Sequence, residues 1–376
     1  MIAYSLAETR KARGLFQGYE LSFHMAEQLN AEVIVVGGGI AGLSAGIYLG
    51  RAERETLIID SDKSMAKWEP DVQNYLGFPE GIAGEDLVER GRQQVERYHA
   101  KIVQDEVVAA EKEGSVFILT GKERTYQAKC LLIATGIYHL PPEIDGVTEC
   151  LGHSMFFCKD CDGFRVRGKQ IAIYGWTNET VQYALGMLFY SSTVFIVTDG
   201  KKVRWDKQHA EWIEEYKIPV YPKSIERVQR EECQVKSLKF SDESELQIDA
   251  LFTTRGDIYF NRLAKNLGAK LDEDGQIVVD LCLRTSVEGL YAAGCVTPAN
   301  CQMIIAAGQG ATAAQSINRD LFEESLATHA LRRFRKVQLE DLKETGSPKD
   351  RKTLSETTPI KDEAKLVSEA SLKDGE

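Results

Sequence analysis

The 376-residue sequence has no run of about 18 apolar residues, the length that a membrane-spanning helix requires. It also has no surplus of basic residues, since 46 Lys and Arg face 57 Asp and Glu, for a net charge of −11. Such a chain is a poor candidate for binding nucleic acid, because the phosphate backbone is neutralised by Lys and Arg. Its eight cysteines have no regular spacing, which excludes a disulfide-stapled secreted scaffold. We therefore expect a cytoplasmic protein in which a close cysteine pair is redox-active or binds a metal.

The chain divides into three regions by composition. Residues 1–30 are mixed and polar and are expected to form an N-terminal extension, with Met25 as an alternative start. From Glu32 to roughly Leu321, short β-branched runs alternate with helical segments, a pattern typical of βαβ units around a mainly parallel sheet. Residues 336–376 have hardly any aromatics and bury too little apolar surface to fold, so we predict a disordered tail. The predicted fold class is α/β.

The strongest motif is a glycine-rich turn between the β-branched run at residues 33–36 and a helical segment. Gly37, Gly39 and Gly42 form the pattern G-x-G-x-x-G. The first glycine permits a tight turn, the second lets backbone amides approach a pyrophosphate, and the third lets the helix lie close to the strand. Asp60 ends the next β-branched run, roughly 20 residues later, where a carboxylate binds ribose hydroxyls in this fold. The combination predicts a dinucleotide site, and a glycine-rich turn without a ligand is the alternative.

Cys158 and Cys161 form a C-x-x-C pattern that is followed by Asp162. Two thiols at this spacing can close a small disulfide, and a helix start can stabilise a thiolate there. Asp162 can move the proton that thiol–disulfide exchange requires. Zinc requires four ligands, and no second C-x-x-C or H-x-x-x-H pattern accompanies this one. The pattern favours a redox-active disulfide and no metal site, with half a zinc site or two inert cysteines as the alternatives.

These residues together resemble the low-molecular-weight thioredoxin reductases, a family of FAD-dependent disulfide oxidoreductases. The likeness continues in order through residues 74–82, 133–136, 168–175, 289–296 and 302–314. The resemblance implies two dinucleotide-binding, Rossmann-like domains, the second inserted in the first. The FAD-binding domain would comprise residues 31–140 and 255–330, and the inserted domain, residues 141–254, would carry the C-x-x-C. Pro141-Pro142 and Thr254-Arg255-Gly256 are the expected hinges.

The resemblance also implies roles for single residues. Cys161 would face the isoalloxazine ring, Cys158 would exchange with the substrate, and Asp162 would act as acid and base. The contacts to FAD would come from Gly37, Gly39, Gly42, Asp60, Asn74, Thr135, Gly294, Cys295 and Gln302. A dithiol or disulfide protein, or a small thiol, would be the partner, and the protein would be a homodimer.

The inserted domain departs from the family pattern where NADPH should bind. A second G-x-G-x-x-A turn is replaced by Gly175, Trp176 and Thr177. The side chain of Thr177 would stand where the backbone must approach the pyrophosphate. Asp199 occupies the place of an arginine-rich cluster and would repel the 2′-phosphate. We therefore expect that NADPH is not used.

The predicted flavin site also differs from the family pattern, at two cysteines. The family has Gly-Asp-Val and Arg-Gln where this chain has Gly294-Cys295-Val296 and Cys301-Gln302, so one polar contact to the ribitol chain is lost. Cys295 and Cys301 are six residues apart, which is not a C-x-x-C, and we expect two small side chains that pack at a helix entrance. The other cysteines are expected as isolated thiols: Cys130, Cys150, Cys233 and Cys282.

A retained disulfide beside a lost NADPH site narrows the resemblance to the diflavin-linked disulfide oxidoreductases of cyanobacteria, in which a second FAD lies against the first. The second flavin would lie at Gly175, Trp176 and Thr177, although Trp176 is equally suited to a core. The predicted function is electron exchange between FAD, one or two per chain, and the C-x-x-C, without NADPH. The alternatives are a ferredoxin- or NADPH-dependent thioredoxin reductase and a non-catalytic, redox-regulated flavin-binding scaffold.

Overall fold

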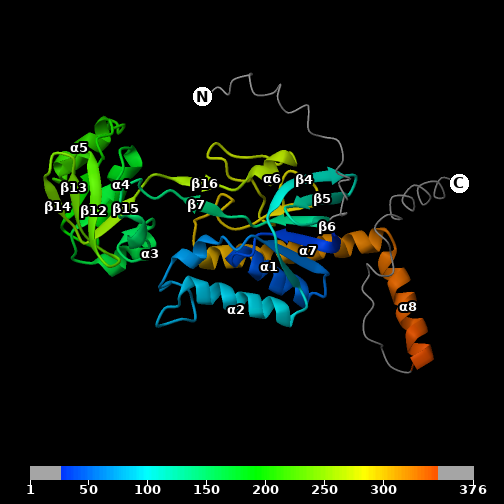
Figure 1. Ribbon diagram of the computed structural model, residues 1–376. Coiled ribbons are helices and arrows are strands. Elements are labelled where there is room, and N and C mark those ends of the chain that lie inside the picture. The colour runs from blue at the N-terminus through cyan, green and yellow to red at the C-terminus, as the bar shows by residue number, and fades with distance from the viewer. Residues whose placement is uncertain (1–26, 346–376) are drawn as a thin grey trace, which may run out of the picture.

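The structure is a computed structural model that describes residues 27–345. Two α/β units lie side by side, each built around its own sheet (Figure 1). Most of the expected N-terminal extension lies outside the described residues. Its last three residues, Gln28–Asn30, already belong to the first strand.

The larger sheet has seven strands: β1 (Gln28–Val36), β2 (Thr56–Asp60), β3 (Lys101–Gln104), β4 (Val107–Glu113), β5 (Val116–Gly121), β6 (Thr125–Ile133) and β17 (Leu290–Ala292). β3, β2, β1, β6 and β17 are parallel neighbours in that order. The first half of β6 pairs instead with β5 on the β17 side, and β5 and β4 continue antiparallel. Parallel strands are covered on both faces, and β2 is accordingly buried along its whole length.

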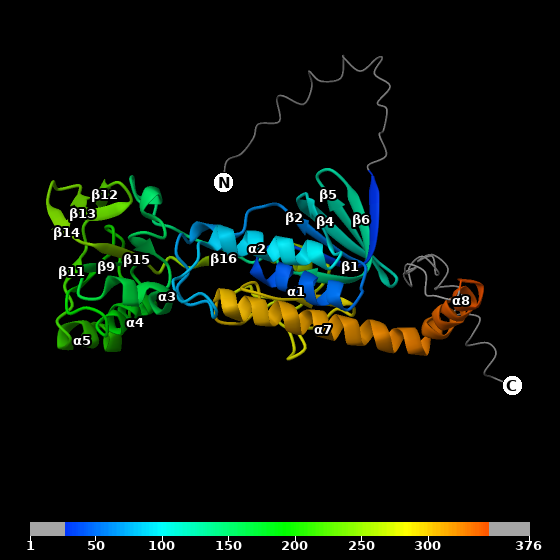
Figure 2. The same ribbon diagram turned by 90° about the horizontal axis from the view of Figure 1, so that it is seen from below.

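Helices α1 (Ile40–Arg51) and α7 (Met303–Ala327) pack side by side against this sheet, and α2 (Gly84–Arg97) lies on the other side of α1 (Figure 2). Small residues allow the close contact between α1 and α7. A Cβ atom on Gly310 would lie 2.1 Å from the carbonyl oxygen of Ala41, and Ser44 Oγ donates a hydrogen bond to the Ala307 carbonyl at 2.7 Å. The start of α7 is thereby placed next to the glycine-rich turn.

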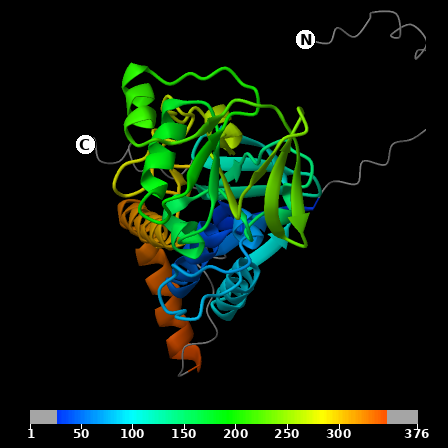
Figure 3. The same cartoon turned by 90° about the vertical axis from the view of Figure 1, so that its left-hand side faces the viewer.

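The smaller sheet is parallel, in the order β11 (Val220–Tyr221), β10 (Val194–Val197), β9 (Ile171–Tyr174), β15 (Ala250–Thr253) and β8 (Met155–Phe156). One face carries α4 (Asn178–Met187) and α5 (Lys207–Glu215). The other face packs against the antiparallel strands β12 (Ile225–Glu231), β13 (Gln234–Phe240) and β14 (Glu245–Gln247), as the end-on view shows (Figure 3). The predicted α/β class with two Rossmann-like units is confirmed.

The two units are joined by strands β7 (Ile137–His139) and β16 (Asp257–Tyr259), which pair antiparallel (Figure 1). The expected hinge segments lie at the ends of these strands. There, Leu140 N donates to the Gly256 carbonyl at 3.1 Å, and the Arg255 guanidinium donates to the Pro141 carbonyl at 2.5 Å. The remaining short helices are η1 (Met65–Trp68), η2 (Thr148–Cys150), α3 (Lys159–Asp162), η3 (Gly163–Val166) and α6 (Arg262–Asn266).

The end of the described chain differs from the prediction. The tail expected at residues 336–376 begins as a helix, α8 (Ala330–Thr345), and the rest of it lies outside the described residues. Leu331, Phe334 and Val337 recur every three residues and are half-buried, while Arg, Lys, Leu and Glu around them favour helix. Within residues 27–345, the longer helices are not apolar enough to span a bilayer.

Candidate active site

A cavity of about 640 Å³ is lined by residues of both units. Most of the residues predicted for FAD and for catalysis line it together: Gly37, Gly39, Asp60, Asn74, Thr135, Cys158, Cys161, Asp162, Gly294, Cys295 and Gln302. Gly42 and the segment Gly175–Thr177 are not among its lining residues. Residues more than 250 positions apart in the sequence thus share one cavity because β1, β6 and β17 are neighbours in the sheet.

The glycine-rich turn forms one wall of this cavity. Gly37 has a φ of +109°, and a Cβ atom there would lie 2.3 Å from the Ala134 carbonyl oxygen, so only glycine fits. A Cβ atom on Gly42 would lie 1.9 Å from the Gly37 carbonyl oxygen, so Gly42 lets the helix pack against the turn. Helix α1 has no side-chain cap at Gly39, which leaves first-turn N–H groups available to bind an anion.

Asp60 fixes this turn to the end of β2. Its buried carboxylate accepts a hydrogen bond from Gly38 N at 3.0 Å and an ion-paired hydrogen bond from Arg92 of α2. Sequence reasoning missed Arg92, whose partner is 32 residues away. These features fit FAD: the cavity is large enough for a cofactor, the uncapped helix start suits the pyrophosphate, and the carboxylate at the strand end suits the ribose.

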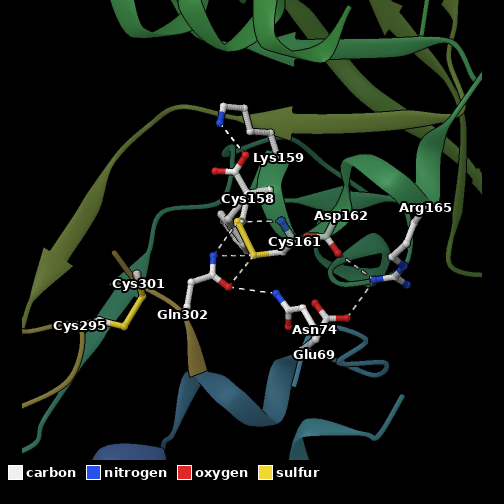
Figure 4. Close-up of a disulfide and its surroundings, with 12 residues drawn as sticks. Glu69, Asn74, Cys158, Lys159, Cys161, Asp162, Arg165, Cys295, Cys301 and Gln302 are labelled. Atoms are coloured by element: carbon white, nitrogen blue, oxygen red, sulfur yellow. Dashed lines mark hydrogen bonds and ion pairs between the residues drawn. A yellow bond between two sulfur atoms is a disulfide. The ribbon is translucent and has the colours of Figure 1, made fainter. Parts of the chain in front are cut away.

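The predicted C-x-x-C is a disulfide at the start of α3 (Figure 4). Cys158 is the N-cap of this helix, and its sulfur accepts a hydrogen bond from Cys161 N at 3.2 Å. Gln302 Nε2 donates to the sulfurs of Cys161 at 3.2 Å and of Cys158 at 3.5 Å. Gln302 Oε1 accepts from Asn74 Nδ2 at 3.0 Å. One amide side chain of the larger unit, Gln302, therefore contacts the sulfur pair of the smaller unit, and Asn74 holds this amide in place.

Asp162 is 6% exposed and belongs to a carboxylate–guanidinium–carboxylate cluster. Arg165 donates to Asp162 Oδ1 and to Glu69 Oε1, each at 3.0 Å. Burial raises the pKa of Asp162 to about 6, although the Arg165 charge opposes the shift. Burial and the nearby Asp162 charge also raise the pKa of Glu69 to about 7. The carboxyl group that follows Cys161 in the sequence therefore has a pKa close to neutral pH, as acid–base groups of active sites often do.

Sequence reasoning missed Glu69 and Arg165. Arg165 stands three residues after Asp162, a spacing at which side chains on a helix meet, so its signal was present. Glu69 follows η1 of the larger unit directly, and its sequence position gives no indication of this contact.

The expectation of two unbonded cysteines at the helix entrance is wrong. Cys295 and Cys301 form a second disulfide, with Cα atoms 4.9 Å apart (Figure 4). The segment between them turns back, so that the end of β17 comes close to the start of α7. A spacing of six residues in the sequence does not indicate that the chain makes this turn. The other four cysteines are free. Among the described residues, no group of three or more His, Cys, Asp and Glu side chains is placed to hold a metal ion.

The turn of the smaller unit is held by protein contacts. The Thr180 hydroxyl accepts from Thr177 N at 3.1 Å and lies 2.8 Å from the Thr254 hydroxyl. Asp199 accepts hydrogen bonds from the Tyr174 hydroxyl at 3.1 Å and from Ile225 N at 2.8 Å. The half-buried Trp176 packs edge-on against Tyr174, with ring centroids 5.9 Å apart.

Comparison with known proteins agrees with this geometry. The family model described as pyridine nucleotide-disulphide oxidoreductase matches residues 31–314. The thioredoxin reductase of Treponema pallidum is 32% identical over 294 residues, which are 76% of this chain and 95% of that protein. A glucosaminate ammonia-lyase of Pseudomonas fluorescens is 31% identical over 314 residues, 79% of this chain and 98% of that protein.

Among solved structures, the thioredoxin reductase of Giardia duodenalis superposes with a TM-score of 0.70 at 26% identity, over 78% of this chain and 99% of that one. The family model spans most of the chain, and the C-x-x-C disulfide lies in the cavity that fits FAD. The chain therefore belongs to the pyridine nucleotide-disulphide oxidoreductase family and is a thioredoxin reductase-like, FAD-dependent disulfide oxidoreductase.

Proposed function

We propose that the protein exchanges electrons between FAD and the Cys158–Cys161 pair, with a dithiol or disulfide protein or a small thiol as the outside partner, and that it does not use NADPH. The contact of Gln302 with both sulfurs supports this proposal most directly, because it holds the pair within the cavity that fits FAD. The FAD-binding domain would comprise residues 31–140 and 255–330, and the inserted domain residues 141–254. We also propose that the protein is a homodimer and is located in the cytoplasm. Sedimentation of the purified protein tests the first point, and cell fractionation tests the second.

Different residues of the cavity would contact different parts of FAD and of the disulfide. The N–H groups at the start of α1 would bind the pyrophosphate, and Asp60 would bind the ribose. Gln302 and Asn74 orient the sulfur pair, and Thr135 and Gly294 complete the wall. FAD, when bound, supplies two-electron redox chemistry, and the protein residues position the disulfide and move its protons.

In the direction of dithiol oxidation, a substrate thiol attacks the Cys158 sulfur. A mixed disulfide forms between substrate and Cys158, the Cys158–Cys161 bond breaks, and Cys161 leaves as a thiolate. The Asp162 carboxylate accepts the proton of the attacking thiol. The second substrate thiol then attacks the mixed disulfide, which releases the oxidised substrate and leaves the Cys158–Cys161 pair reduced.

The contacts of Thr177 and Asp199 support the proposal that NADPH is not the electron source. At the turn of the smaller unit, the Thr177 N–H already donates to Thr180. The Asp199 carboxylate stands where a positive charge is needed for the 2′-phosphate, and Tyr174 and Ile225 hold it there.

Anaerobic reduction of the flavin tests the function. Dithiothreitol should bleach the flavin of the FAD-bound protein, whereas excess NADPH or NADH should leave it oxidised over the same period. The Cys161→Ser variant should keep its flavin and lose the response to dithiothreitol. Rapid bleaching by NADPH would show that the protein is an NADPH-dependent reductase. Reduction of the flavin by dithiothreitol in Cys161→Ser would contradict the assignment of Cys158 and Cys161 as the redox-active pair.

The resemblance to diflavin-linked relatives extends the proposal to a second FAD at Gly175–Thr177. Trp176 supports it, because the ring is half-buried and therefore keeps part of its surface accessible. The flavin released on denaturation, measured per polypeptide, should approach two. A ratio that stays near one after reconstitution with excess FAD would contradict the second flavin and favour a ferredoxin-fed enzyme.

A further inference from the structure

The function proposed above uses one disulfide of the cavity and gives the other no role. All eight cysteines of the chain lie within the described residues. The four that line the cavity are the four that are disulfide-bonded, and the four free thiols lie outside it. Both sulfur pairs belong to half-buried residues, so both are open to the cavity.

Gln302 adjoins both sulfur pairs. Gln302 follows Cys301 directly and is the N-cap of α7, and its amide contacts the sulfurs of Cys161 and Cys158 (Figure 4). Of the two, the Cys161 sulfur is nearer to this amide, at 3.2 Å against 3.5 Å. The second disulfide is therefore attached to the residue that holds the first.

The second disulfide is poorly suited to a purely structural role. The segment that it closes is already fixed, because Gly294 N donates to Gln309 at 2.7 Å and Thr297 Oγ1 donates to the Gly294 carbonyl at 2.8 Å. Ile277 N also donates to the Val296 carbonyl at 2.8 Å. Stabilisation by a disulfide grows with the length of the loop that it closes, and this loop spans only six residues.

We propose that Cys295–Cys301 is a second redox-active disulfide, which exchanges with the Cys158–Cys161 pair inside the cavity. The proposal rests on the redox role proposed for Cys158 and Cys161. With that pair reduced, the Cys161 thiolate attacks the Cys301 sulfur after the Gln302 amide moves aside. A Cys161–Cys301 bond forms, the Cys295–Cys301 bond breaks, and Cys295 leaves as a thiolate.

Cys158 then completes the transfer. Its thiolate attacks the Cys161 sulfur, which restores the Cys158–Cys161 disulfide and releases Cys301. Two electrons and two protons have passed from the first pair to the second, and no outside oxidant is consumed. A second dithiol substrate could then reduce Cys158–Cys161 again, so that each pair holds two electrons.

A trapped intermediate tests the proposed contact. The Cys158→Ser/Cys295→Ser variant leaves Cys161 and Cys301 without their partners, and mild oxidation with glutathione disulfide should join them. Non-reducing digestion and mass spectrometry should find the Cys161–Cys301 peptide in most chains. The matched Cys161→Ser/Cys295→Ser variant, which leaves Cys158 and Cys301, should give at least tenfold less cross-link. No cross-link in either variant would overturn the proposal.

The unmodified, FAD-bound protein provides the second measurement. It is treated with one equivalent of dithiothreitol per chain, quenched with acid, alkylated and mapped by mass spectrometry. Alkylation shared between the two pairs supports the exchange. If the flavin is bleached while Cys295–Cys301 stays closed, the inference is wrong and the proposed function stands. If the flavin stays oxidised and neither pair is alkylated, the proposed function fails and this inference with it.

Discussion

Asp162 offers the sharpest test of the proposed chemistry, because its pKa predicts a pH profile. With a pKa of about 6, roughly nine-tenths of the Asp162 side chains are ionised at pH 7 and about one-tenth at pH 5. If the carboxylate accepts the proton of the attacking thiol, its contribution falls about tenfold between these pH values. A carboxyl group with the ordinary pKa of 3.8 would stay ionised throughout.

The assay is anaerobic reduction of the flavin by dithiothreitol, followed by stopped flow in the wild type and in Asp162→Asn. The ratio of the two rates cancels the ionisation of dithiothreitol itself. We expect this ratio to be on the order of 10²–10⁴ at pH 7, the usual worth of a general base. The ratio should fall about tenfold by pH 5, with its midpoint near 6.

Asp160→Asn is the matched control, because Asp160 is two residues away and its side chain is 70% exposed in a pair with Lys159. Its rate should stay close to that of the wild type. Arg165→Gln should move the midpoint above 6, since the charge and hydrogen bond of Arg165 lower the pKa of Asp162. A ratio that does not change between pH 5 and pH 7, or an equal loss in Asp160→Asn, would refute the role of Asp162.

Three further predictions concern the same cavity. Cys158→Ser should leave a Cys161 thiolate beside oxidised flavin, visible as a long-wavelength absorption band, and a spectrum without that band would contradict the orientation of the pair. Gln302→Ala removes the donor to both sulfurs and should slow dithiol-driven flavin reduction at least tenfold while the purified protein keeps its flavin; an unchanged rate would show that this contact is dispensable. Gly37→Ala should destabilise the fold by several kcal/mol and weaken FAD retention, because the added Cβ would meet the Ala134 carbonyl; thermal unfolding within a degree or two of the wild type would be inconsistent with this packing.

The sequence was informative where function depends on neighbouring residues. Gly37, Gly39 and Gly42 act together within a single turn, and Cys158, Cys161 and Asp162 within a single short helix. Patterns of this kind can be interpreted without knowing the fold. The parallel sheet could also be predicted, because its strands are β-branched runs that alternate with helices.

The rest of the site depends on tertiary contacts between distant segments. Glu69 reaches Asp162 only because the two units meet, and Arg92 reaches Asp60 only because α2 lies beside the larger sheet. Cys295 and Cys301 looked like isolated small residues because a disulfide requires the chain to turn back on itself. Composition alone also misjudged residues 336–345, which continue the helix α8 that begins at Ala330 and has Leu331, Phe334 and Val337 half-buried.

The neighbouring positions of β1, β6 and β17 have a consequence for synthesis of the chain. The cavity is lined by Gly37 near the beginning and by Gly294 and Gln302 near the end, so the ribosome must release almost the whole chain before this wall can close. Strands β8 to β15, in contrast, are contiguous in sequence and can assemble earlier. Domains generally fold as units during translation, and contacts of long sequence separation form slowly. The unit that carries the reactive thiols would thus be in place before the cofactor can bind, and the nascent Cys158 and Cys161 would depend on the redox state of their surroundings until then.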